Sequence, residues 1–82
     1  MAHTQIIAYL AVIARATIDP SLAPAHLDSL EKRVGAARVI GEVLNKRGGF
    51  NLMRTALESD LGWCPGCRTI ERYWHGIGSW LG

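Results

Sequence analysis

Apolar side chains recur at every third or fourth position along four stretches of the chain, which is the spacing that places them on one face of a helix. The first stretch, 5–17, is apolar almost all round and has Thr4 where an N-cap would stand. Asp19 and Pro20 close it, because the residue before a proline is pushed out of the helical region. A helix that is apolar on all sides must be covered from more than one direction, by its own domain or by a second chain.

The second stretch is the longest and predicts the central helix of the fold. It has Pro24 in its first turn and runs to about Arg47, where Gly48 and Gly49 end it. One stripe of apolar or small side chains follows this helix: Leu27, Leu30, Val34, Ala37, Gly41 and Leu44. Such a stripe is buried against neighbouring elements.

Two further features of this helix concern its packing and its exposed face. Gly35 and Gly41 each weaken a helix by about 1 kcal/mol relative to alanine, a cost that close approach of another backbone offsets. Oppositely charged side chains lie one turn apart and predict solvated ion pairs. These pairs are Asp28 with Lys32, Arg38 with Glu42, and Glu42 with Lys46.

The last two stretches predict shorter helices. Phe50 and Asn51 make a turn, and Asn51 is the N-cap of a third helix that ends near Leu61. A fourth helix starts near Cys67 and carries a face of large apolar side chains: Ile70, Tyr73, Trp74, Ile77 and Leu81, with Trp80 beside them. No stretch shows the two-residue alternation of a half-buried strand.

These elements predict one all-α domain over residues 1–82, a small bundle of four helices with the long second helix at its centre. The chain has 82 residues, of which 49% are hydrophobic, so a single core is the limit. Because so small a core gives only a few kcal/mol of net stability, and the first helix is apolar all round, we expect a homodimer.

The charge and the N-terminus favour an ordinary cytoplasmic protein. The formal net charge is only +2, with Lys and Arg scattered rather than massed, which is a weak signature for nucleic-acid binding. Residues 1–4 lack the basic start of a secretory signal. The apolar run 6–13 is too short to span a bilayer, since Arg15 and Asp19 follow it.

The strongest local motif is a pair of cysteines, Cys64 and Cys67, separated by Pro65 and Gly66 and preceded by Trp63. Just before a helix, backbone amides lower the pKa of a thiol, which favours a redox pair. The order resembles the Trp-Cys-Gly-Pro-Cys sequence of thioredoxins with proline and glycine exchanged. That resemblance covers five residues, and thioredoxins place the pair after a strand, which this sequence does not offer.

Other interpretations of the pair stay open. A helical dithiol enzyme of the alkylhydroperoxidase type needs a histidine and an acid nearby, and here Glu71 is near but the next histidine is His75. Two cysteines at this spacing supply half of a tetrahedral zinc site, for which His75 is the nearest further ligand and His3 and His26 are distant ones. The remaining interpretation is that Cys64 and Cys67 are small reduced side chains at a turn.

The aromatic end of the chain suggests contact with another protein. Tryptophan and tyrosine dominate binding hot spots, and the candidate partner-binding residues are Tyr73, Trp74, Ile77 and Trp80. Trp63 and Trp74 are expected to fill the core, whereas Trp80, near the C-terminus, is expected to be the most exposed.

A helix-turn-helix is the second alternative, with the turn at 48–51. Lys46, Arg47 and Arg54 would touch phosphates and Asn51 would lie near base edges, although the preceding helix is long for that motif. No arrangement for catalysis is present in the sequence, and no family is recognised across the chain. We therefore expect a non-enzymatic, self-associating protein-interaction module without a cofactor, with a zinc or redox site at the cysteine pair as the alternative.

Overall fold

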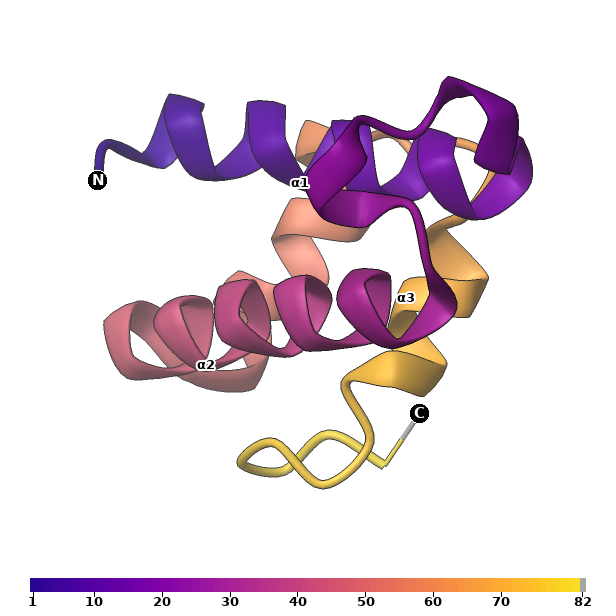
Figure 1. Ribbon diagram of the computed structural model, residues 1–82. Coiled ribbons are helices and arrows are strands. Elements are labelled where there is room, and N and C mark those ends of the chain that lie inside the picture. The colour runs from indigo at the N-terminus through magenta and orange to yellow at the C-terminus, as the bar shows by residue number, and fades with distance from the viewer. Residues whose placement is uncertain (82) are drawn as a thin grey trace.

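A computed structural model describes residues 1–81 and shows an all-helical fold with no strand in that part of the chain (Figure 1). Its α-helices are α1 (His3–Ile18), α2 (Leu30–Thr55) and α3 (Cys67–Tyr73). Three shorter turns accompany them: the 3-10 turns η1 (Pro20–Leu22) and η2 (Ala25–Leu27), and the π turn η3 (Ala56–Asp60). The all-α prediction is confirmed, but the count of four helices is wrong.

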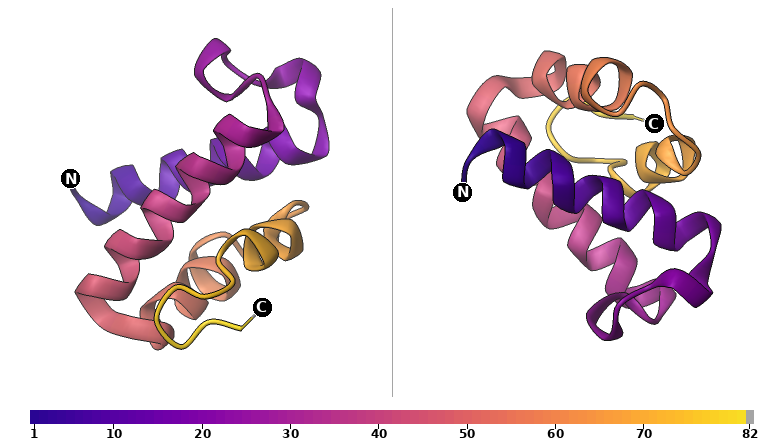
Figure 2. Two further views of the ribbon diagram at one scale, coloured as in Figure 1. Left: turned by 60° about the horizontal axis from the view of Figure 1, so that its bottom comes forward. Right: turned by 90° about the horizontal axis from the view of Figure 1, so that it is seen from above.

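The count differs because the predicted second and third helices are one element. At Gly49 the backbone is not helical, with φ 67° and ψ −159°, so α2 consists of two helical segments that meet at a kink. Helical structure resumes at Phe50, and the predicted turn with an Asn51 cap does not form. The two glycines mark the bend, which turns the last part of α2 and η3 back toward α1 (Figure 2).

The helix ends follow local chemistry that differs in part from the predictions. Asp19 ends α1 as predicted, whereas Thr4 lies inside the helix. Pro24 opens η2 instead of α2. α2 begins at Leu30, where the Ser29 hydroxyl accepts a hydrogen bond from the Lys32 amide at 3.2 Å. That bond satisfies one of the free amides of the first turn, which makes Ser29 the true N-cap.

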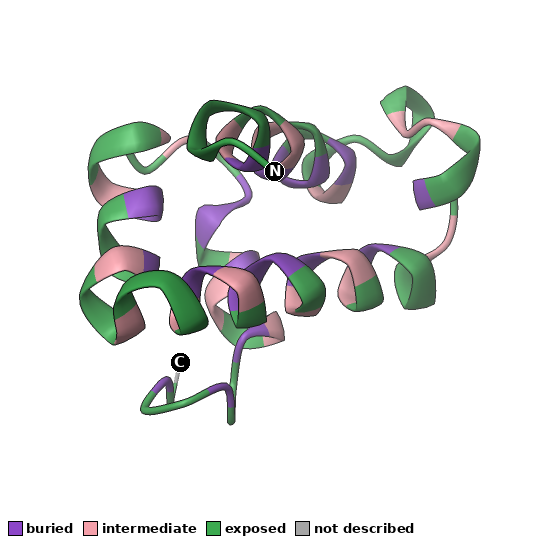
Figure 3. Ribbon diagram, turned by 90° about the vertical axis from the view of Figure 1, so that its left-hand side faces the viewer, coloured by how far each residue is buried: buried purple, intermediate pink, exposed green. Residues whose placement is uncertain are grey.

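α2 lies at the centre of the fold, as predicted, and contacts α1, η2, η3 and α3. α1 and the first part of α2 run in opposite directions (Figure 1). Their buried residues lie on the sides that face each other (Figure 3). The largest fully buried side chains include Ile6, Leu10, Ile13, Leu27, Leu44, Met53, Leu57, Ile70 and Trp74.

Trp74 and Gly41 show how closely α3 packs on α2. The Trp74 indole Nε1 donates to the Ala37 carbonyl at 2.7 Å, and a Cβ at Gly41 would lie 2.7 Å from the same ring. The expected close approach is therefore confirmed at Gly41. It is wrong at Gly35, where a Cβ would meet nothing within 4 Å.

α1 is buried on one side only within this chain. Ile6, Leu10 and Ile13 are inaccessible, while Val12 and Ile18 are exposed on its outer face. The expectation that this helix is covered from more than one direction is not met by the chain itself. Among residues 1–81, no helix combines the length and the apolar character needed to cross a membrane.

The C-terminal segment after α3 folds back onto the core instead of continuing the helix. The Gly76 amide donates to the Trp80 carbonyl at 2.8 Å. The Trp80 ring lies 4.9 Å from Phe50 and 5.2 Å from Trp74, between ring centroids. Trp80 is only 4% exposed, so the expectation that it is the most exposed tryptophan is wrong.

One arginine explains both this fold-back and a missing ion pair. Arg38 Nη1 donates to the Tyr73 carbonyl at 2.7 Å and to the His75 carbonyl at 2.8 Å. It thus satisfies carbonyls left free at the end of α3 and does not pair with Glu42. Among residues 1–81, the predicted pair of Glu42 with Lys46 is also absent, whereas Asp28 and Lys32 pair at 2.9 Å as predicted.

Candidate functional site

The loop 61–66, here called the Trp63 loop, joins η3 to α3 and is bordered by three surface hollows of about 450, 450 and 500 Å³. Trp63 lines the first and the third of these hollows, and Cys64 lines the second and the third. These three hollows therefore adjoin one another at the Trp63 loop.

The backbone at Trp63 is strained. Among residues 1–81, Trp63 is the one residue other than glycine with a positive φ, at 53°. Such a conformation costs about 1 to 3 kcal/mol and persists only where the surroundings enforce it. The Trp63 amide donates to the Leu57 carbonyl at 2.8 Å, which fixes the turn, and the side chain is 45% exposed. The structure thus holds a large apolar ring in water.

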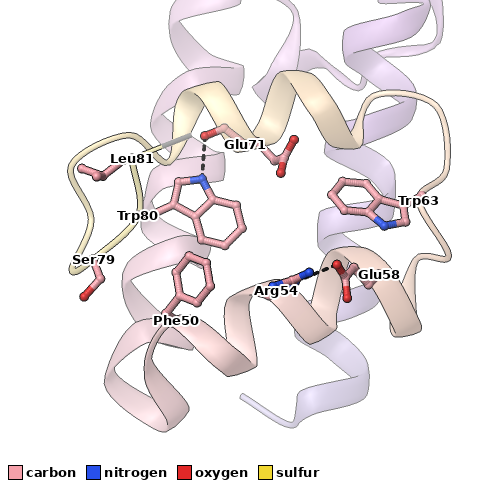
Figure 4. A pocket seen from close by; sticks show the side chains of 8 residues that line it. All are labelled: Phe50, Arg54, Glu58, Trp63, Glu71, Ser79, Trp80 and Leu81. Carbon is pink, nitrogen blue, oxygen red and sulfur yellow. Dashed lines mark hydrogen bonds and ion pairs between the residues drawn. The ribbon is translucent and has the colours of Figure 1, made fainter.

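The first hollow, here called the aromatic groove, has Trp63 on one side and the C-terminal segment on the other (Figure 4). Its lining residues are Phe50, Arg54, Glu58, Trp63, Glu71, Ser79, Trp80 and Leu81. The Trp80 indole Nε1 donates to the Glu71 carbonyl at 2.9 Å, which fixes one wall. Three aromatic rings from distant parts of the sequence therefore line one recess.

The charges of the aromatic groove are unbalanced. Arg54 Nε pairs with Glu58 Oε1 at 2.7 Å across one turn of α2 and η3. The carboxylate of Glu71 lies at the groove between Trp63 and Trp80 (Figure 4). Within residues 1–81 no cation lies within ion-pair distance of Glu71. The groove therefore combines apolar rings with one carboxylate that is open to a positive charge.

The two cysteines follow Trp63 in the chain and line the third hollow together with it. Their Sγ atoms are 3.4 Å apart and both thiols are free. Cys67 is 1% exposed, while Cys64 is half-buried. Burial raises the pKa of Cys67 to about 12, with further contributions from contact with Cys64 and from the charge of Glu71. Cys67 is thus a protonated, inaccessible thiol at neutral pH, and Cys64 is the accessible member of the pair.

The structure does not bring the predicted zinc ligands together. Cys64 and Cys67 are in contact, but His75 lies beyond the far end of α3 and its Nδ1 contacts the Leu81 carbonyl at 3.1 Å. Of the distant ligands, His3 pairs with Asp60 at 3.0 Å, and the ring of His26 stacks on Tyr9. Residues 1–81 contain no cluster of three His, Cys, Asp or Glu side chains suited to a metal ion.

The residues predicted to contact a partner are mostly in the core. Trp74, Ile77 and Trp80 are at most 5% exposed, and Tyr73 is half-buried. Little of these side chains is accessible to another protein. Trp63, which was expected in the core, is the exposed ring instead. The signal for this was its place in a loop between Gly62 and the cysteine turn, since loops run over the surface.

The residues of the predicted helix-turn-helix have intramolecular contacts. Arg47 Nη2 donates to the Met1 carbonyl at 2.6 Å, and Arg54 pairs with Glu58. At Gly49, within the segment 48–51, two helical segments of α2 meet at a kink, with no loop between them. The nucleic-acid alternative therefore gains no support from this geometry.

Comparison with known proteins finds no matching family model, no matching curated protein and no matching solved structure. The class that the fold defines is that of small all-helical proteins.

Proposed function

We propose that this chain is a small, non-enzymatic protein-interaction module that binds a segment of another protein in the aromatic groove. The observation that supports this proposal most strongly is Trp63, a large ring held exposed on a strained backbone at the mouth of that groove. A buried ring would contribute more to stability, so the exposure of this one is explained by a partner that covers it.

The lining of the groove defines the chemistry of the partner segment. Phe50 and Trp63 offer exposed apolar surface, the nearly buried Trp80 forms a wall behind them, and Glu71 offers a carboxylate. Aromatic faces attract apolar side chains and also cations, with guanidinium groups the most frequent. A carboxylate forms its strongest hydrogen bonds with a guanidinium group. The preferred occupant is therefore a segment that presents an apolar side chain next to an arginine.

Short fluorescent peptides that alternate leucine with arginine test this proposal, with leucine-glutamate peptides of the same length as the charge-reversed control. Fluorescence anisotropy of the peptide and emission from the tryptophans report binding. We expect Trp63→Ala and Glu71→Gln each to weaken binding of the arginine peptide at least tenfold, about 1.4 kcal/mol. Val39→Ala is the matched control, because Val39 is exposed and does not line the groove.

Two results would contradict the groove as the binding site. One is equal affinity for the arginine and glutamate peptides, since the charge of Glu71 predicts discrimination. The other is unchanged binding in the Trp63→Ala variant while circular dichroism shows the native helix content. Binding lost equally in Val39→Ala would place the contact on a different face.

The homodimer predicted from the sequence stays a prediction and concerns a different surface. Val12 and Ile18 are exposed on the outer face of α1 and support self-association through that helix. Sedimentation of the whole chain at micromolar concentration measures it. A dimer that dissociates in the Val12→Ser, Ile18→Ser double variant is the expected result, and a stable monomer in the unchanged chain contradicts it.

A further inference from the structure

The contact between Cys64 and Cys67 is held in place by the surrounding fold. The Cys67 amide donates to the Cys64 carbonyl at 3.1 Å, which closes the turn between them. Gly66 has φ 99°, and a Cβ there would collide with the Ala14 carbonyl oxygen and lie 2.8 Å from Thr17 Oγ1. The turn is thus packed against α1 too tightly for any residue but glycine, which keeps the backbone of the two cysteines close together.

The distance between the sulfurs is short enough for a bond to form with little movement. A disulfide bond is about 2.05 Å long, and the two Sγ atoms are 3.4 Å apart. The half-buried Cys64, which lines two hollows, is the side chain with room to move toward Cys67. The pair is therefore arranged to convert between dithiol and disulfide.

The two thiols differ in access, which assigns them different roles. Cys64 lines two hollows, of about 450 and 500 Å³, which have room for a small organic molecule. Cys67 is inaccessible and lines only the second of these hollows. Because burial raises the pKa of Cys67, this thiol keeps its proton at neutral pH. An incoming reagent therefore meets Cys64 first.

We propose that Cys64 and Cys67 form a thiol-disulfide exchange site whose oxidant is a small organic disulfide. The Cys64 thiol gives its proton to solvent, and its sulfur attacks one sulfur of the small disulfide. A mixed disulfide forms on Cys64, and the released thiolate takes up a proton. Cys67 then attacks Cys64 Sγ and passes its proton to the departing sulfur, which leaves as the second small thiol. The protein loses two electrons to the reagent, whose one disulfide becomes two thiols.

Intact-mass measurement on the whole chain, treated with hydroxyethyl disulfide and then alkylated, tests this site. The unchanged chain is expected to lose the mass of two hydrogens and to take up no alkyl group, as an internal disulfide requires. Cys67→Ser is expected to trap the intermediate and to gain the mass of one small thiol less two hydrogens at Cys64. Cys64→Ser is expected to react at least about tenfold more slowly, because Cys67 is buried.

Controls keep each outcome informative. The Cys64→Ser variant is also labelled in urea, where its remaining thiol, Cys67, is exposed and is expected to react. Slow labelling of the folded variant then reports the burial of Cys67. The time course of the unchanged chain, in which the mixed disulfide rises and then falls, tests ring closure without any variant. A mixed disulfide that persists in the unchanged chain, disulfide-linked dimers as the main product, or equal native labelling of both single variants would overturn the proposal.

Discussion

Two tryptophans eleven positions apart, Trp63 and Trp74, have opposite environments. Trp74 is fully buried, donates to the Ala37 carbonyl and fits against Gly41. Trp63 is 45% exposed, sits on a strained backbone and lies between two hollows. The C-terminal segment around Trp74 thus contributes to stability, whereas the Trp63 loop offers groups that the core does not use. Binding and thiol chemistry are therefore expected at the Trp63 loop.

The largest expected difference is between alanine substitutions of the two tryptophans. Trp74→Ala removes a buried ring and its hydrogen bond and is expected to lower the free energy of unfolding by about 3 to 5 kcal/mol. Trp63→Ala is expected to change it by less than about 1 kcal/mol, because much of the ring is already in water. Urea denaturation measures both values. A loss at Trp63 as large as that at Trp74 would remove the contrast between the two regions.

A second test concerns the anchored end of the Trp63 loop. Gly66→Ala adds a Cβ to a crowded position with positive φ, and we expect a loss of more than about 2 kcal/mol in the free energy of unfolding. Gly62→Ala, at φ 58° with open space around it, is the matched control and is expected to cost about 1 kcal/mol. Thermal and urea denaturation of the two variants measure the difference. Equal losses would show that packing against α1 does not hold the loop.

A third test concerns the packing beneath Trp74. Gly41→Ala forces the indole ring to shift and is expected to lower the free energy of unfolding by about 1 to 3 kcal/mol. Gly35→Ala meets nothing and is expected to raise it by up to about 1 kcal/mol, since alanine favours a helix. Opposite signs for two identical changes in one helix are the expected result. The same sign for both would contradict the packing of Trp74 on α2.

The last test depends on pH and concerns Cys67. Its folded-state pKa is raised to about 12 from the ordinary value of 9.0, so above pH 9 the unfolded chain loses this proton before the folded chain does. The stability contributed by the neutral thiol is complete below about pH 9 and is lost as the pH rises toward 12. Free energies of unfolding measured along this range are expected to fall more steeply in the unchanged chain than in Cys67→Ala. Parallel slopes would contradict the burial of this thiol.

The part of the fold that depends on periodicity was predictable from the sequence. The end of α1 at Asp19 and the central place of α2 follow from spacing and from proline, which act locally. The predicted stripe of the second helix is buried at Leu27, Ala37, Gly41 and Leu44, but the prediction is wrong at Leu30, which is 59% exposed. The start of α2 was predictable as well, because Ser29 is a good N-cap, but Pro24 was a competing signal five positions before Ser29. Where two local signals compete for the start of a helix, tertiary packing decides which one is used.

The candidate site was predictable only in part. The spacing of Cys64 and Cys67 indicated a paired thiol site, and the structure brings these two sulfurs together. The groove was missed because its rings, from Phe50, Trp63 and Trp80, meet only after the bend in α2 and the fold-back of the C-terminal segment. Contacts between residues so far apart leave no spacing pattern in the sequence.

By itself the sequence determined that the chain is helical, where its apolar faces run and where two thiols lie close along the chain, because these properties depend on neighbours within one or two helical turns. Tertiary structure decided which tryptophan is buried, that two helical segments meet at a kink at Gly49 with no loop between them, and that His75 lies away from the cysteines. The physical reason is that burial of a side chain depends on what the rest of the chain packs against it.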